Sequence, residues 1–204
     1  YGIMRWLIQD MRADPGLRCD VVATGAHFAP EFGMTYKAIE ADGLPIARRV
    51  EIQLASDSAA GMVKSTGLAL VSFADVFADL DPDVVVVLGD RYEIAAVAMA
   101  AFMSGVPLAH ISGGEKTEGA VDDALRHIVT KCARYHFVAA QEYRRRVIQL
   151  GEPPENVFDV GDPGVDNIHR LPLLDGQETA ARIGRDPARP YFLVTYHPAT
   201  SEAV

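Results

Sequence analysis

The chain has 204 residues and a formal net charge of −9, from 19 lysines and arginines against 28 aspartates and glutamates. This acidic balance argues against a broad surface for nucleic-acid phosphates or anionic lipid. Hydrophobic residues make up 49% and charged residues 23%, as in ordinary globular chains, and the length predicts one full domain with some sequence left over. The longest apolar stretch, residues 94–103, is shorter than the ~20 residues of a membrane span.

Short β-branched runs alternate with longer helical stretches, a pattern typical of a parallel sheet covered by helices on both faces. The runs predict strands over residues 20–23, 83–88, 108–111, 135–139, 157–160 and 191–195. The stretches between them predict helices over residues 3–12, 62–78, 94–103, 121–133 and 142–150. Strand 83–88 has a valine run without polar alternation, so we expect both of its faces to be buried at the centre of the sheet.

The two ends of the chain carry their own expectations. A doubly wound sheet normally begins with a strand, whereas the first predicted element is a helix, so we expect a strand before Tyr1. Glycines and prolines in segment 172–190 predict a domain boundary there. Cys19 and Cys132 lie far apart and are interpreted as buried thiols of a reducing compartment, which makes the cytoplasm the expected location.

Chemically active residues follow the predicted strands where each one ends. In open α/β sheets, ligands bind beyond the carboxyl ends of the strands. At those positions the sequence has Thr24-Gly25-Ala26-His27, Gly89-Asp90-Arg91, Ser112-Gly113-Gly114-Glu115, Gly161-Asp162 and Tyr196-His197. Carboxylates, histidines and glycines therefore converge on one edge of the sheet, which predicts a site there.

Two carboxylates at this edge are candidates for proton transfer. Asp90 follows an apolar strand and a glycine, so partial burial is expected to bring its pKa toward the range of a general acid or base. The alternative is a cap for the helix that begins near Glu93. Glu115 follows Gly113 and Gly114, whose backbone N–H groups are suited to an anion. The alternative for Glu115 is a solvated loop position.

The helix after Gly119 places charged residues four positions apart. This spacing pairs Asp122 with Arg126, and Asp123 with His127, along the helix surface. One interpretation is a helix stabilised by acids in its first turn. The other is an arginine that holds a substrate anion through two hydrogen bonds. His110 lies inside a predicted strand, where a core histidine is expected.

Motifs for common cofactors are missing from the sequence. No Gly-x-Gly-x-x-Gly follows a predicted strand, and there is no phosphate-binding loop of the Walker type. Neither cysteine has a second cysteine or a histidine at metal-ligand spacing. The sequence therefore predicts no nicotinamide, ATP or metal site.

Taken together, these motifs resemble those of the hydrolysing UDP-N-acetylglucosamine 2-epimerases of bacterial sialic-acid biosynthesis. The resemblance covers nearly the whole chain, and its strength lies in the order and spacing of the motifs. The matching residues are Thr24-Gly25-Ala26-His27, Glu31-Phe32-Gly33-Met34-Thr35, Gly89-Asp90-Arg91-Tyr92-Glu93, His110-Ile111-Ser112-Gly113-Gly114-Glu115, Gly119-Ala120-Val121-Asp122-Asp123, Arg126-His127, Lys131 and Gln149-Leu150-Gly151-Glu152.

The resemblance implies a fold and an assembly. Members of this family have a two-domain fold of the glycosyltransferase-B type, with the active site between two Rossmann-like halves, and commonly form homodimers. Residues 1–184 are then a Rossmann-like N-terminal domain that lacks its first strand, and residues 185–204 begin the C-terminal UDP-binding domain. The chain is expected to be shortened at both ends and inactive on its own.

The resemblance also implies a reaction. UDP-N-acetylglucosamine and water give N-acetylmannosamine and UDP, by elimination of UDP to a glycal and hydration of the glycal, without a cofactor. The implied catalytic residues are Asp90, Glu115, Asp122, Arg126 and His197. The implied substrate-binding residues are His27, Arg91, Gly113 and Gly114.

Three alternatives remain open at the level of the sequence. One is a related hydrolysing enzyme that acts on a UDP-2,4-diacetamido-6-deoxy sugar. Another is the non-hydrolysing 2-epimerase, although its members usually carry a Glu-Ala-Gly loop and a Glu-Glu-x-Asn-Arg helix where this chain has Gly-Gly-Glu and Asp-Asp-Ala-Leu-Arg-His. The third is a nucleotide-sugar binding module or glycosyltransferase half without this chemistry.

Overall fold

The computed structural model describes residues 1–54, 58–186 and 188–196. The strands are β1 (Val21–Thr24), β2 (Ile46–Val50), β3 (Val85–Leu88), β4 (Leu108–Ile111), β5 (Tyr135–Val138) and β6 (Val157–Asp159). The helices are α1 (Arg5–Ala13), α2 (Tyr36–Ala41), α3 (Ala59–Leu80), α4 (Tyr92–Met103), α5 (Val121–Cys132), α6 (Gln141–Gln149), α7 (Asp166–Arg170) and α8 (Gly176–Arg182). Short 3-10 turns are η1 (Gly25–Phe28), η2 (Pro30–Phe32), η3 (Pro154–Asn156) and η4 (Pro163–Val165).

All strand pairs in the described residues are parallel, which confirms the predicted α/β class. β1 pairs with β2, and β3, β4, β5 and β6 form a second sheet in that order. β2 was not among the predicted strands, because Arg48 and Arg49 interrupt its apolar pattern and both side chains are exposed. An edge strand of this kind needs apolar residues on one face only.

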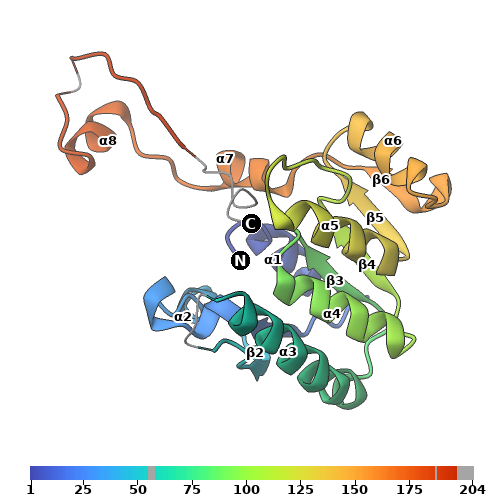
Figure 1. Ribbon diagram of the computed structural model, residues 1–204. Coiled ribbons are helices and arrows are strands. Elements are labelled where there is room, and N and C mark those ends of the chain that lie inside the picture. The colour runs from blue at the N-terminus through green and yellow to red at the C-terminus, as the bar shows by residue number, and fades with distance from the viewer. Residues whose placement is uncertain (55–57, 187, 197–204) are drawn as a thin grey trace.

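Helices cover both faces of β1, as expected for a doubly wound sheet. Val22 packs into the main core beneath α3 and α4, whereas Val21 and Ala23 pack into a second cluster with Ile8 of α1 and Ile39 of α2. Successive side chains of a strand point to opposite faces, so these contacts place the two helix layers on opposite sides. Figure 1 shows α3, α4 and α5 side by side in one layer.

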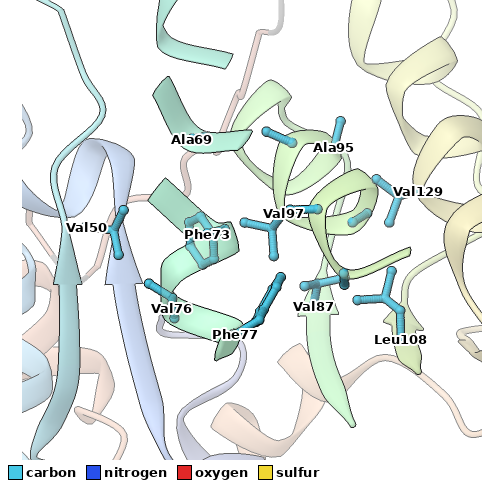
Figure 2. Packing of buried hydrophobic residues seen from close by; sticks show 14 of the residues in the cluster. Val50, Ala69, Phe73, Val76, Phe77, Val87, Ala95, Val97, Leu108 and Val129 are labelled. Atoms are coloured by element: carbon cyan, nitrogen blue, oxygen red, sulfur yellow. The ribbon is translucent and has the colours of Figure 1, made fainter. Parts of the chain in front are cut away.

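The main core lies between this helix layer and the strands. Figure 2 shows Phe73 and Phe77 of α3, Val97 of α4 and Val87 of β3 pointing toward one another, with Val50 of β2 at one side. The rings of Phe73 and Phe77 lie 5.6 Å apart. Alanines fill most of the remaining buried positions of α4, which allows α3 and α5 to pack closely on either side of it.

Helix α3 begins three residues before its predicted start. The Ser58 side chain accepts a hydrogen bond from the Gly61 N–H at 3.1 Å and caps the helix, and Asp81 ends it in the left-handed conformation with φ 44°. By length and composition alone α3 is apolar enough to cross a membrane, although Lys64, Ser65 and Thr66 interrupt its apolar sequence. Its buried side chains, Phe73 and Phe77 among them, belong to the core of this fold.

The prediction that strand 83–88 lies at the sheet centre is wrong. β3 is the edge strand of its sheet among the described residues, and of the valine run only Val87 is buried, while Val84 is 43% exposed. β4 takes the central place, and all four of its residues are buried. The β-branched run makes a strand, but the order of strands in the sheet decides which one is covered on both sides.

The prediction of a strand over residues 191–195 is also wrong. This segment pairs with no strand in the part of the chain that the structure describes, and Phe192 and Leu193 are 93% and 89% exposed. Strand propensity does not order a segment that lacks a hydrogen-bonding partner. The segment follows α8, which lies away from the layered body in Figure 1. The predicted boundary between residues 184 and 185, and the strand expected before Tyr1, stay predictions.

The two cysteines differ from the prediction of buried thiols. Cys19 and Cys132 are both free and partly exposed. Partial burial raises the pKa of each thiol, which favours the protonated form.

Candidate active site

The loops that carry the predicted site residues leave the sheet at neighbouring points. β3 and β4 are parallel, with Leu88 opposite Ile111, and the Gly89 N–H donates to the Ile111 carbonyl at 3.2 Å. Asp90 and the loop that contains Glu115 therefore start from the same edge. Helix α5 returns to this edge with its first turn.

Arg126 of α5 joins the two loops. Its side chain is 3% exposed, and its guanidinium makes an ion pair with the Asp90 carboxylate. The same group donates to the Glu115 carbonyl at 2.8 Å, to Thr117 Oγ1 at 2.7 Å and to Asp123 Oδ1 at 3.0 Å. Asp90 therefore serves as the partner of Arg126, and the N-cap of α4 is Arg91, which makes no side-chain capping bond.

The charge pairing along α5 differs from the predicted spacing. Among the described residues, Arg126 pairs with Asp123, three positions earlier, rather than with Asp122. Asp123 also accepts a hydrogen bond from the Thr117 N–H at 2.8 Å, which lowers the pKa of its carboxyl. His127 lies 3.8 Å from Asp123, as its spacing of four predicts. The supporting roles of Asp123 and Thr117 were not predicted from the sequence; the three-residue spacing between Asp123 and Arg126 is the signal that could have indicated the first of them.

Two other predicted carboxyls have raised pKa values. Burial raises the pKa of Glu115, the charge of Arg126 opposes this, and the charges of Asp162 and Asp90 add to it. Burial also raises the pKa of Asp122, and the charge of Asp90 adds to that shift. The edge thus combines a carboxylate ion-paired to a buried arginine with two carboxyls that hold protons more readily, an arrangement suited to proton transfer in both directions.

Arg91 is oriented by a buried carboxylate that the sequence analysis did not assign to the site. Its Nε and Nη2 atoms each donate to Glu93 at 3.2 Å; the Glu93 side chain is 7% exposed and that of Arg91 58%. Burial lowers the pKa of Arg91, but the charge and hydrogen bonds of Glu93, with smaller contributions from Tyr92 and Asp122, outweigh this effect and the pKa is raised. A Cβ at Gly25 would lie 3.0 Å from Glu93 Cγ, so a glycine there lets η1 approach the start of α4.

His27 lies on η1, beside this pair. Its Nδ1 is 2.8 Å from Thr35 Oγ1, a contact that links two of the quoted motifs. Burial lowers the pKa of His27, and the charge of Glu93 opposes the shift. A direct contact between His27 and substrate stays a prediction.

Gly113 and Gly114, in the loop after β4, are both buried. A Cβ at Gly113 would lie 3.0 Å from His110 Nδ1, and one at Gly114 would lie 2.5 Å from the Tyr143 carbonyl oxygen of α6. Arg146 of α6 donates a hydrogen bond to the Gly114 carbonyl. The structure thus gives the glycine pair a packing reason, and their contact with a substrate anion stays a prediction.

Gly114→Ala is expected to destabilise the protein by about 3 kcal/mol or more. Gly114 has φ +79°, which costs a side chain about 1–2 kcal/mol, and the collision with Tyr143 adds overpacking. Gly161→Ala is the matched control, because Gly161 has φ +82° with open space around it, and about 1 kcal/mol is expected there. Urea denaturation of both variants measures the difference. Equal losses would contradict the close contact with α6.

His197, the remaining predicted catalytic residue, lies outside the described residues. Within the described ranges, no group of three or more histidine, cysteine, aspartate or glutamate side chains is arranged to hold a metal ion.

A sequence profile of the UDP-N-acetylglucosamine 2-epimerases matches residues 9–204. The chain belongs to this family. The resemblance on which the sequence analysis relied is therefore confirmed.

Curated relatives of this chain include hydrolysing enzymes of two bacteria. The GDP/UDP-N,N'-diacetylbacillosamine 2-epimerase (hydrolyzing) of Campylobacter jejuni is 39% identical over 98% of this chain and 52% of its own length. The UDP-N,N'-diacetylbacillosamine 2-epimerase (hydrolyzing) of Legionella pneumophila is 36% identical over 99% of this chain and 53% of its own length. The polysialic acid biosynthesis protein P7 of Escherichia coli is 42% identical over 98% and 51%. The chain spans about half the length of these relatives.

Solved structures of the family share the fold. The UDP-GlcNAc 2-epimerase of Neisseria meningitidis bound to UDP-GlcNAc aligns with a TM-score of 0.73 at 20% identity, over 88% of this chain and 47% of that one. A second UDP-N-acetylglucosamine 2-epimerase aligns with a TM-score of 0.74 over 85% and 49%. These alignments confirm the predicted fold class.

Proposed function

We propose that the full-length gene product is a hydrolysing 2-epimerase that releases UDP from a UDP-N,N'-diacetylbacillosamine-type sugar. Two of the relatives described above carry this activity in their names, at 39% and 36% identity. This proposal replaces UDP-N-acetylglucosamine as the first choice of substrate. UDP-N-acetylglucosamine remains the second candidate, because a relative at 42% identity is named for polysialic acid biosynthesis.

The observation that carries the proposal is the pairing of Asp90 with buried Arg126 beside Glu115 and Asp122. In the proposed elimination, a carboxylate takes the C2 proton while the bond from C1 to the UDP oxygen breaks, leaving a C1–C2 double bond. Water then adds its hydroxyl to C1, and a proton returns to C2 on the other face. The two proton transfers require at least two carboxyl groups in different protonation states.

Roles for the individual residues follow from their surroundings. Asp90, ion-paired with Arg126, is the proposed base. Glu115 and Asp122, with raised pKa values, are the proposed proton carriers for hydration. Arg91, fixed by Glu93 and 58% exposed, is oriented to meet the diphosphate of the leaving group. His197 is proposed to assist the departure of UDP.

The test is incubation of the full-length gene product with each UDP-sugar in turn, followed by phosphorus and proton NMR. The expected products are UDP and the free 2-epimer, formed faster from UDP-N,N'-diacetylbacillosamine than from UDP-N-acetylglucosamine. A sugar epimerised at C2 but still linked to UDP would show the non-hydrolysing reaction. No turnover of either sugar would favour a binding module.

The rate of this reaction is expected to fall in mild acid. Because the pKa values of Glu115 and Asp122 are raised, their ionised forms are lost at a higher pH than for ordinary carboxyls of pKa about 4. One of the two must be ionised to take a proton from the attacking water, so kcat falls as pH decreases through the raised pKa. Initial rates between about pH 4 and pH 9 measure this limb. A flat profile down to about pH 4 would contradict the assignment.

We also propose that the protein forms a homodimer through the outer face of α3. Val63 and Val71 are each 71% exposed there, in a helix with mean hydropathy 1.3. Light scattering of the full-length gene product is expected to give twice the monomer mass, and Val63→Glu with Val71→Glu to give the monomer. A wild-type monomer would contradict this proposal.

A further inference from the structure

His110 lies where three segments meet, which carry the proposed catalytic residues Asp90, Glu115 and Arg126. It is in β4, is fully buried, and stands opposite Val87 of β3 in the strand register. Its Nε2 is 2.9 Å from the Gly89 carbonyl oxygen, and its Nδ1 is 3.2 Å from Thr130 Oγ1. The same Nδ1 would lie 3.0 Å from a Cβ at Gly113, so the imidazole ring packs directly against that glycine.

Each of these contacts is adjacent in sequence to a proposed catalytic group. Gly89 precedes Asp90, Gly113 lies two residues before Glu115, and Thr130 lies one helical turn after Arg126. The His110 side chain therefore contacts all three segments from the protein interior, and it is not part of the surface that meets substrate.

The hydrogen-bond partners determine the tautomer of His110. The Gly89 carbonyl can only accept, so Nε2 carries the proton. In the neutral ring, Nδ1 then accepts from the Thr130 hydroxyl. Burial lowers the pKa of His110 to about 4, although the Gly89 carbonyl opposes the shift, so the ring is neutral at neutral pH.

We propose that His110 is a positioning residue of the 2-epimerase reaction, which orients Asp90 through the Gly89 carbonyl and holds Glu115 and Arg126 in register with it. The inference rests on the proposed function. Gly89 has φ +90°, a conformation open to glycine alone among common residues, so the direction of its peptide plane depends on what binds the carbonyl. The Nε2–H bond fixes that direction.

His136 provides an internal comparison. It is the residue of β5 opposite His110 in the register, and it is equally buried. Its Nε2 lies 3.3 Å from Glu152, which follows α6 and is also bound by Lys131. Glu152, the direct partner of His136, lies outside the segments that carry Asp90, Glu115 and Arg126, so a change at His136 tests the loss of a buried histidine side chain that has no hydrogen bond to those segments in the described structure.

The experiment compares His110→Ala, His110→Gln and His136→Ala in the full-length gene product, using the UDP-sugar that the wild type hydrolyses. His110→Ala is expected to lower kcat about 100-fold while KM changes less than about threefold, because misplacement of the base by about 1 Å has this effect. His110→Gln keeps an N–H donor near the position of Nε2 and is expected to recover kcat to within about tenfold of wild type. His136→Ala is expected to lower the melting temperature as much as His110→Ala, with kcat within about threefold of wild type.

Two outcomes would overturn the inference. One is a kcat for His110→Ala close to that of wild type, and the other is an equal loss of kcat in His136→Ala. Failure of the wild type to hydrolyse either UDP-sugar would instead overturn the proposed function, and the inference with it.

Two further measurements cover the case in which His110→Ala does not fold. Thr130→Val removes only the hydroxyl that bonds Nδ1 and is expected to lower kcat about fivefold with KM unchanged, and an unchanged kcat would count against the inference. Nitrogen-15 NMR of the wild type is expected to show the neutral Nε2–H tautomer from about pH 6 to pH 8. A charged ring or the Nδ1–H tautomer in that range would overturn the assigned hydrogen bond.

Discussion

Arg126→Met is expected to lower the free energy of unfolding by about 2–3 kcal/mol and kcat by about a thousandfold or more. The variant removes the only cation found among the described residues to pair with Asp90, together with the donors to Thr117 and to the Glu115 carbonyl. Loss of one partner of a buried ion pair costs about 3–5 kcal/mol; we expect less because the Asp90 and Asp123 carboxylates are 27% and 28% exposed and regain some water.

Arg126→Lys separates charge from geometry. A lysine keeps the positive charge but cannot reach Asp90, Asp123 and two neutral oxygens from one planar group. We expect this variant to regain about half of the lost stability while kcat stays about 100-fold below wild type. Urea denaturation and initial rates of UDP release measure the two effects. Full recovery of kcat by lysine would show that charge alone is required.

Asp90→Asn is expected to lower the rate of UDP release about 10³- to 10⁴-fold with a change in stability within about 1 kcal/mol. The amide oxygen still accepts from Arg126, so the loop keeps its contact, but the amide cannot take the C2 proton. Initial rates and urea denaturation of the same preparation measure both quantities. Turnover near the wild-type level would contradict the assignment of Asp90 as the base.

Asp123→Asn is the matched control for this prediction, because Asp123 pairs with the same guanidinium. Its carboxylate also accepts a hydrogen bond from the Thr117 N–H, so we expect Asp123 to stabilise the loop between β4 and α5. We expect a loss of about 1 kcal/mol in stability and a decrease in kcat of about tenfold. A decrease as large as that of Asp90→Asn would mean that both carboxylates act through Arg126 alone.

The correctly predicted strands have partner strands in the structure, whereas the wrongly predicted strand at residues 191–195 has none among the described residues. β4 and β5 are apolar and find parallel partners within the chain, so local composition and tertiary context agree. Residues 191–195 are just as apolar but have no partner strand among the described residues. β2 forms despite Arg48 and Arg49, because β1 supplies its hydrogen bonds. Strand pairing is a long-range interaction, which composition alone does not specify.

By itself, the sequence determined the α/β class, the family and the sheet edge at which the candidate site residues gather, because strand and helix periodicity and the motifs after each strand are local properties. Only the tertiary structure decided that Arg126 binds Asp90 and Asp123 rather than Asp122, and that Glu93 orients Arg91. It also decided which strand is central. These outcomes depend on distances between residues up to 36 positions apart in the sequence. The packing of α4 and α5 on the sheet determines those distances.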